Sequence, residues 1–208
     1  MKRLAFIGGG GFAKEVLEIA ELGGHRVVGY VADAEGLIAC AYWGRREALA
    51  ERRGEFDAVC IAFGATDRKS ARSRQSVIQW VADQGFESEP LISPHAVRAS
   101  GSTIGAGTIV AHGVVISVDA RIGSFAILNT GAIIGHDAVI GDNVTVAPAA
   151  FIGGGSRIGS GSLVGPGASV LQSLTVGSEV IVGTGASVVR NVPDRATVMP
   201  LRSKVLQG

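Results

Sequence analysis

A six-residue repeat runs through the second half of the chain. From Ile104 to Val188 every sixth residue is Ile, Leu or Val, which gives fifteen consecutive positions without a slip. Glycine follows the aliphatic residue in nine of these hexads, and a small or β-branched residue often comes four positions after it. This period matches neither the 3.6-residue turn of an α-helix nor the two-residue alternation of an extended strand. It is typical of a short strand followed by a tight bend.

Three such strands close one triangular coil of 18 residues, so the fifteen hexads make about five coils. Successive coils then pair in parallel about 4.8 Å apart, and each inward aliphatic side chain stacks on the one 18 residues away. We expect the glycine after the aliphatic residue to permit the bend, because glycine adopts backbone conformations that other residues avoid. The repeat therefore predicts a parallel β-solenoid.

The first 92 residues lack this period and alternate strand and helix patterns. Strands and helices that alternate predict a small parallel α/β domain of the Rossmann-like kind. The Ser93-Pro94 step marks the expected junction, which divides the chain into 1–92 and a solenoid domain with a C-terminal tail at 93–208. The expected strands are 3–7, 25–31 and 57–63, and the expected helices are 12–22 and 66–84.

A glycine-rich loop joins the first expected strand to the first expected helix. The pattern Gly8-x-Gly10-x-x-Ala13, with Asp33 twenty residues further on, formally matches a dinucleotide-binding fingerprint. About 90 residues hold only half of a dinucleotide fold, which favours a mononucleotide or the phosphates of a nucleotide sugar. A tight turn that binds nothing is the alternative. The candidate substrate-binding residues here are Gly8, Gly9, Gly10, Gly11 and Asp33.

Composition excludes several classes of protein. The net charge of +1 and the apolar fraction of 47% argue against a disordered chain and a nucleic-acid-binding protein. The pairs Arg45-Arg46 and Arg52-Arg53 are expected to be solvated surface. The sequence contains no run of about 18 apolar residues, so no membrane span is predicted. Two cysteines cannot form a disulfide framework, and no secretory signal is evident, so we expect a cytoplasmic protein.

His136 is the candidate catalytic residue of the solenoid. Residues 18 positions apart share one corner of a triangular coil, which places His136 in a stack with Gly154, Gln172 and Arg190. The adjacent Asp137 would orient the imidazole and make it more basic, as a general base requires. A glycine beside it could offer an unobstructed N–H to a developing oxyanion. A solvated polar corner without chemistry is the alternative.

A metal site is not expected. His112 lies 24 residues from His136 and so on a different side of the coil, where we expect a structural or subunit-surface role. A zinc site needs three convergent protein ligands, and the histidine spacing does not supply them.

Three stretches of the sequence are similar to one known family. They are Ile7–Val16, Asn129–Asp137 and Val182–Pro193. On these motifs, nearly the whole chain resembles the hexapeptide-repeat sugar O/N-acyltransferases of the sialic-acid O-acetyltransferase type, which include nucleotide-amino-sugar N-acetyltransferases. The resemblance implies a left-handed parallel β-helix, although ordinary crossovers between parallel strands are right-handed.

The resemblance also implies roles for residues. His136 would be the general base that takes a proton from the sugar amine, and Asp137 would support it. Asn129 would lie near the sugar, and the Gly154 amide would bind the thioester oxygen of acetyl-CoA. The glycine-rich loop and Asp33 would hold the nucleotide.

Relatives are homotrimers with acetyl-CoA in the groove between neighbouring solenoids, so the active site would use two chains. We expect Gln172 and Arg190 to contact the coenzyme as well. Three departures weaken the match: Phe12 and Thr145 stand where relatives carry histidine, and the tail at 197–202 differs from the usual ending.

The expected function is therefore acetyl transfer from acetyl-CoA to a nucleotide-linked amino sugar, with a 4-amino-4-deoxy sugar of glycan or glycoprotein synthesis as the leading substrate. Two alternatives stay open. One is O-acetylation of a sugar hydroxyl, as in sialic acid. The other is a non-catalytic solenoid that acts as a scaffold. Both cysteines lie outside the solenoid, so no thiol nucleophile is expected there.

Overall fold

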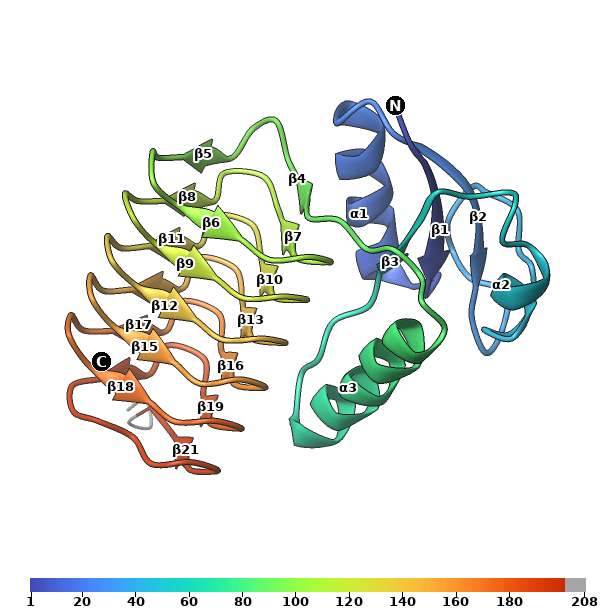
Figure 1. Ribbon diagram of the computed structural model, residues 1–208. Coiled ribbons are helices and arrows are strands. Elements are labelled where there is room, and N and C mark those ends of the chain that lie inside the picture. Colours follow the sequence, from blue (N-terminus) through green and yellow to red (C-terminus); the bar gives the residue numbers. More distant parts are fainter. Residues whose placement is uncertain (201–208) are drawn as a thin grey trace, which may run out of the picture.

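The computed structural model describes residues 1–200, and it contains an N-terminal α/β part packed beside a solenoid (Figure 1). The expected tail departure at 197–202 thus lies partly outside the described residues. The N-terminal part holds a parallel three-stranded sheet in the order β2-β1-β3. Its elements are β1 Arg3–Ile7, α1 Gly11–Leu22, β2 Arg26–Val31, α2 Ala48–Glu51, β3 Ala58–Ile61 and α3 Arg68–Asp83.

These elements confirm the strands and helices expected from the sequence, except that the four-residue helix α2 was not expected. The start of α3 is fixed by a capping box: the Asp67 side chain accepts from the Ser70 N–H at 2.7 Å, and the Ser70 hydroxyl accepts from the Asp67 N–H at 3.0 Å. Such reciprocal bonds satisfy backbone donors that a helix start leaves unpaired.

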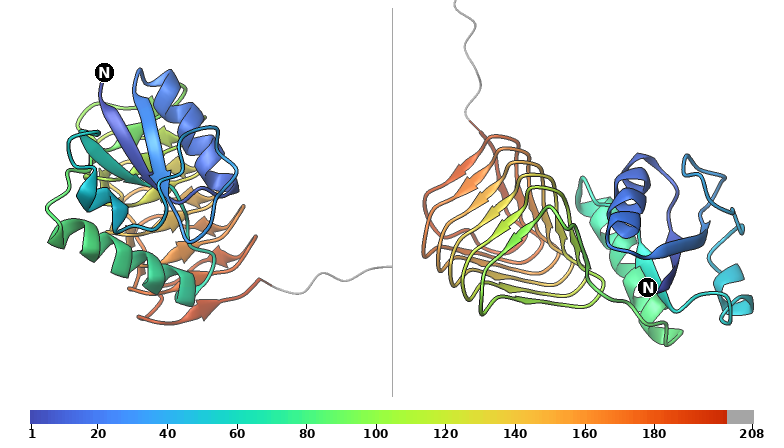
Figure 2. Two further views of the ribbon diagram at one scale, coloured as in Figure 1. Left: turned by 90° about the vertical axis from the view of Figure 1, so that its right-hand side faces the viewer. Right: turned by 90° about the horizontal axis from the view of Figure 1, so that it is seen from above.

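The solenoid is a triangular prism with three parallel sheets, visible as stacked triangles when viewed along its axis (Figure 2). Face one packs toward the N-terminal part and contains β4 Leu91–Ile92, β7 Ile109–Val110, β10 Ile127–Leu128, β13 Thr145–Val146, β16 Leu163–Val164, β19 Ile181–Val182 and β21 Thr197–Val198. Face two contains β5 Val97–Arg98, β8 Val115–Ile116, β11 Ile133–Ile134, β14 Phe151–Ile152, β17 Ser169–Val170 and β20 Ser187–Val188. Face three contains β6 Thr103–Ile104, β9 Arg121–Ile122, β12 Val139–Ile140, β15 Arg157–Ile158 and β18 Thr175–Val176.

The 18-residue register predicted from the repeat is confirmed between β4 and β20, for example where Ile134 pairs with Ile152. From β8 to β20 the second residue of each strand points inward, and these side chains, from Ile116 to Val188, are all buried. These stacked aliphatic side chains are removed from water along the whole prism, which stabilises the fold in proportion to the apolar area buried.

The solenoid has about six turns, one more than expected. The repeat did not predict the first turn, because Arg98 occupies the aliphatic position of the hexad before Ile104. The repeat did not predict the last turn either, because that coil is shorter: Val198 pairs with Val182, only 16 residues away. The first solenoid strand, Leu91–Ile92, lies just before the expected boundary at residue 93.

The expected role of the repeated glycine was wrong. The residue with positive φ comes three positions after the aliphatic residue, as in Asp137 (φ 58°) and Asn143 (φ 53°), and not directly after it. The glycine that follows the aliphatic residue instead allows neighbouring coils to approach. A Cβ on Gly135 would lie 2.5 Å from the Gly154 nitrogen, inside contact distance with the next coil.

A buried arginine fastens α3 to the solenoid. The Arg74 side chain is fully buried, and its guanidinium donates to the carbonyls of Phe63 (3.0 Å) and Phe125 (2.7 Å) and to Oδ1 of Asn143 (2.6 Å). Burial lowers the pKa of Arg74 to about 10, so the group stays charged at neutral pH. Because Phe63 precedes the loop into α3, this contact fixes that loop against face one.

We expect Arg74→Met to lower the free energy of unfolding by about 3–5 kcal/mol. The change leaves three buried acceptors without a donor, at about 1–3 kcal/mol each, and the loss of a desolvated charge and the volume refilled by methionine offset part of this cost. Chemical denaturation measures this. Arg72→Met is the matched control on the same helix: its ion pair with Glu179 is exposed, and such pairs contribute about 0–1 kcal/mol. Equal stability of the two variants would contradict the assignment.

Candidate active site

His136 and Gly154 lie against each other at the corner between faces two and three. An ideal Cβ on Gly154 would lie 2.5 Å from Nε2 of His136, so the imidazole covers the glycine in the next coil. The Nδ1 atom of His136 lies 2.8 Å from Oδ2 of Asp137. Both side chains are open to solvent in this chain, with exposed fractions of 67% and 65%.

The backbone explains this arrangement. Asp137 occupies the positive-φ turn position of its hexad, which aspartate tolerates better than most residues, and this turn places its carboxylate beside the preceding imidazole. The carbonyl of His136 accepts from the Gly155 N–H at 2.8 Å, which ties the two coils together. The Gly154 N–H donates to no group within residues 1–200. The corner thus combines an oriented imidazole with a free backbone donor.

Gln172 and Arg190 continue this corner in the next two coils, because the 18-residue register holds through β17 and β20. Both are exposed. Their expected contact with the coenzyme stays a prediction.

Asn129 lies at a different corner, between faces one and two, and one chain does not bring it to His136. It lines a cavity of about 470 Å³ between face one and the N-terminal part. Phe12 and Thr145 line the same cavity. The two positions that depart from the family and the expected sugar contact therefore line one cavity, which is largely apolar.

The glycines of the glycine-rich loop have different roles: Gly9 packs against neighbouring residues, whereas Gly10 and Gly11 are open. A Cβ on Gly9 would lie 2.4 Å from the ring of Tyr30, and the Gly9 carbonyl accepts from the Leu37 N–H at 2.6 Å, so Gly9 serves packing. Gly10 and Gly11 have no heavy atom within 4 Å of an added Cβ, and α1 begins there without a side-chain cap. Open N–H groups at a helix start favour an anion such as phosphate.

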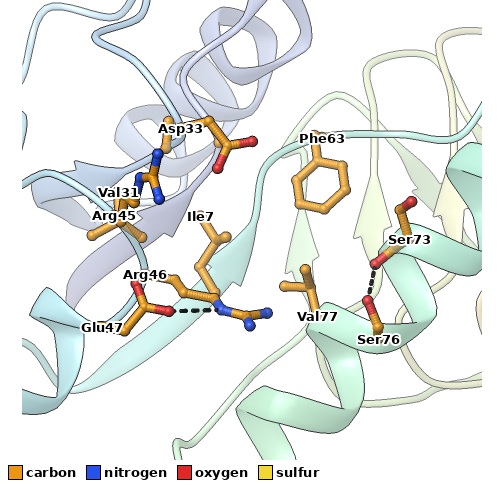
Figure 3. A pocket seen from close by; sticks show the side chains of 12 residues that line it. Ile7, Val31, Asp33, Arg45, Arg46, Glu47, Phe63, Ser73, Ser76 and Val77 are labelled. Atoms are coloured by element: carbon orange, nitrogen blue, oxygen red, sulfur yellow. Dashed lines mark hydrogen bonds and ion pairs between the residues drawn. The ribbon is translucent and has the colours of Figure 1, made fainter.

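A second cavity, of about 620 Å³, opens at the carboxyl edge of the N-terminal sheet (Figure 3). Gly8 and Asp33 both line it, as the fingerprint predicts for a nucleotide site. Its apolar wall comes from the ends of β1 and β2, from the segment after β3 and from α3: Ile7, Val31, Phe63 and Val77. The structure thus brings together the loop and the carboxylate that the sequence singled out.

Arg45 is exposed, as expected, and the Arg46 side chain is 42% exposed, but their position at a cavity was not expected. Both line the 620 Å³ cavity, together with Glu47 (Figure 3). Arg46 lies 5.4 Å from the centre of the Trp80 ring, a contact between residues 34 positions apart in sequence. No local pattern signals this, because the charge of the pair is visible in the sequence but its tertiary partner is not.

His112 lies at the junction of the two parts, where its Nδ1 is 2.6 Å from the Ser93 hydroxyl and its Nε2 is 3.7 Å from Oε2 of Glu18. These contacts suit a structural role. Residues 1–200 contain no cluster of three side chains suited to hold a metal ion. In the same range, no helix is long and apolar enough to cross a membrane.

Comparisons with known proteins match this architecture. Residues 3–81 match the family described as the PglD N-terminal domain, and residues 119–154 match the bacterial transferase hexapeptide family. A histidine-to-asparagine variant of perosamine N-acetyltransferase from Caulobacter crescentus is 32% identical, with a TM-score of 0.89 over 99% of this chain and 97% of that chain. This chain belongs to the hexapeptide-repeat sugar acyltransferases.

A second member of these acyltransferases, the acetyltransferase domain of PglB from Neisseria gonorrhoeae, is 30% identical, with a TM-score of 0.88 over 96% of this chain and 98% of that chain. That domain was crystallised with acetyl coenzyme A, and the perosamine enzyme with CoA and GDP-perosamine. No curated protein matches this acyltransferase at a significant level. Its solenoid matches the left-handed β-helix implied by the resemblance.

Proposed function

We propose that this acyltransferase moves an acetyl group from acetyl-CoA to the amine of a nucleotide-linked amino sugar, in the synthesis of a glycan or glycoprotein precursor. The observation that carries the proposal is the imidazole of His136, held by Asp137 and packed against the free amide of Gly154. Its support includes two relatives of at least 30% identity that were crystallised with CoA and GDP-perosamine or with acetyl coenzyme A.

In the proposed reaction the neutral sugar amine attacks the thioester carbonyl carbon. With Nδ1–H of His136 donating to Asp137, the bare Nε2 takes the proton that the amine loses. The negative charge that develops on the carbonyl oxygen accepts the Gly154 N–H. The carbon–sulfur bond then breaks, and the imidazolium returns the proton to the leaving sulfur, which gives CoA thiol and the amide.

Direct attack on the thioester fits the positions of the cysteines. Cys40 and Cys60 both lie in the N-terminal part, and burial raises the pKa of Cys60 to about 12. A thiol that stays protonated at neutral pH is a poor nucleophile. In the proposed reaction, neither cysteine therefore forms an acyl-enzyme.

The two cavities give the nucleotide sugar an extended path. Gly8 and Phe63 line the 620 Å³ cavity, while Phe12 and Gly64 line the 470 Å³ cavity. The open turn at Gly10–Gly11 lies on the chain between them, so it suits the phosphates that link nucleoside and sugar. The sugar would then point toward Asn129.

Coenzyme A would run along the corner that follows His136. The exposed side chains of Gln172 and Arg190 offer this elongated substrate an amide and a cation, and the cation suits its phosphates.

A homotrimer completes the site in this proposal, because Asn129 and His136 occupy different corners of one chain. The outer side of face two carries an exposed apolar line next to His136: Val97, Ile133 and Phe151 have exposed fractions of 59%, 43% and 39%. Contiguous apolar side chains of this kind mark interaction surfaces. A neighbouring solenoid on face two would bring one chain's His136 toward the Asn129 cavity of another. We place this assembly in the cytoplasm, where two free cysteines remain reduced.

The proposal predicts release of CoA thiol only when acetyl-CoA and a nucleotide-linked amino sugar are both present. A thiol-release assay with GDP-, UDP- and dTDP-linked 4-amino-4-deoxy sugars measures it, and mass spectrometry of the product distinguishes an amide from an ester. The matched 4-hydroxy sugars are the control. Turnover of the hydroxy sugars alone would contradict N-acetylation. If the protein bound neither substrate and showed no turnover, a scaffold role would be indicated.

A further inference from the structure

Arg46 projects its guanidinium into the 620 Å³ cavity and is held in place from two sides (Figure 3). Its carbon Cζ lies 5.4 Å from the centre of the Trp80 ring, and its Nε donates to Oε1 of Glu47 at 3.2 Å. The two terminal nitrogens, Nη1 and Nη2, make no hydrogen bond within residues 1–200. The side chain thus presents two terminal donors that the described residues leave unused.

The other residues of the cavity suit the ribose and the face of a ring, so the Arg46 guanidinium is placed to contact the base of a nucleotide. An acidic residue that follows the second strand of such a fold binds ribose hydroxyls, and Asp33 occupies that position. Asp33 and Arg46 lie on opposite sides of the cavity in Figure 3. Between them, Ile7, Phe63 and Val77 provide an apolar wall suited to a planar ring.

A guanidinium fork selects an edge with two adjacent acceptors. Guanine offers O6 and N7 side by side, and a bidentate contact from arginine to these atoms is the commonest specific contact to that base. On the same edge adenine pairs an acceptor with a donor, and thymine or uracil offers a single carbonyl oxygen. Cytosine has two adjacent acceptors only on its pairing edge.

We propose that Arg46 determines the nucleotide specificity of this acyltransferase, and that its two Nη groups bind O6 and N7 of guanine. The substrate would then be a GDP-linked amino sugar. This inference rests on the proposed function for the identity of the cavity as a nucleotide site, and it goes further by naming the base and the residue that reads it.

Binding of nucleotides without any sugar or coenzyme tests the inference separately from catalysis. Isothermal titration calorimetry compares GDP, UDP, dTDP, CDP and ADP with 7-deaza-GDP, which lacks only the N7 acceptor. One good bidentate contact gives about 1–3 kcal/mol of discrimination, or about 5- to 150-fold in Kd. We therefore expect GDP to bind at least about fivefold more tightly than the other four nucleotides, and 7-deaza-GDP to bind several-fold more weakly than GDP.

The Arg46→Lys variant keeps the charge but loses the fork. We expect it to bind GDP and 7-deaza-GDP within about twofold of each other. Arg52→Lys is the matched control, because Arg52 also stacks on an aromatic ring (Trp43, 5.1 Å) and pairs with a carboxylate (Glu55, 2.9 Å) but does not line the cavity. It should keep the full preference.

Each outcome decides the inference. Equal affinity for all five nucleotides, tighter binding of CDP, or an unchanged penalty for 7-deaza-GDP in Arg46→Lys would overturn it and leave the proposed acetyl transfer standing. An equal loss for every nucleotide in Arg46→Lys would assign the side chain to phosphate, which also overturns it. Failure of every nucleotide to bind would contradict the proposed function itself.

Discussion

We expect replacement of His136 by alanine to lower kcat for the proposed acetyl transfer by about 10²–10⁴-fold, the usual contribution of a general base. The proton of the attacking amine then has no acceptor beside the free amide of Gly154. The affinity for CoA and for nucleotide should change little, because the imidazole is exposed and its loss removes few contacts in the free chain. Steady-state kinetics and calorimetry on the same preparation measure the two effects.

His25→Gln serves as the control for loss of a histidine, because His25 lies in the turn between α1 and β2 and outside both cavities. Its activity should equal that of the unaltered protein. A His136→Ala variant that keeps normal turnover would show that another group accepts the proton.

The proposed site between two chains adds a second readout. A chain with His136→Ala and a chain with Asn129→Ala each lack one half of the site. Mixed trimers of the two contain a complete site wherever an intact His136 meets an intact Asn129, so mixing should recover a measurable fraction of activity. Absence of any recovery, with mixed trimers verified by mass spectrometry, would argue that one chain contains the whole site.

Gly154→Ala should reduce kcat by about 10²–10³-fold, which is the range for loss of one oxyanion donor. The added Cβ would lie 2.5 Å from Nε2 and 2.7 Å from Cε1 of His136. The exposed imidazole must therefore move away, and the methyl group takes the space in which the thioester oxygen would reach the amide. Both consequences act on the reaction, while the fold should keep its stability because Gly154 does not have a positive φ.

Gly54→Ala is the matched control, because an added Cβ at Gly54 meets no heavy atom within 4 Å and its φ is not positive. Circular dichroism and thermal unfolding should show both variants folded. Full activity of Gly154→Ala would remove this glycine from the mechanism.

Much of the fold follows from local sequence because the solenoid repeats one interaction. Each hexad specifies an inward aliphatic residue, and the same requirement recurs in every coil, so the 18-residue register and the stack that contains His136 could be predicted before any contact was known. The same reasoning missed the first turn, where Arg98 replaces the aliphatic residue, and the shortened last turn at Val198.

The parts that could not be predicted depend on contacts between distant segments. The repeated glycine after the aliphatic residue looked like a turn former, yet its purpose is the close approach of the next coil, which only the stacked backbone reveals. Arg46 likewise gains its meaning from Trp80 on another element. By contrast, Gly8 and Asp33 could be predicted from the fingerprint spacing, and the parallel pairing of β1 with β2 brings the ends of these strands together.

The 18-residue register also fixes the spacing of equivalent residues along the solenoid axis. Parallel strands are spaced about 4.8 Å apart, so Arg190, three coils beyond His136, stands about 14 Å along the prism from the imidazole. Distances along this corner can change only in whole steps of one coil. Deleting 18 residues between the two would bring the cation about 5 Å nearer and leave every other rung intact, which gives a way to measure how far the bound coenzyme extends.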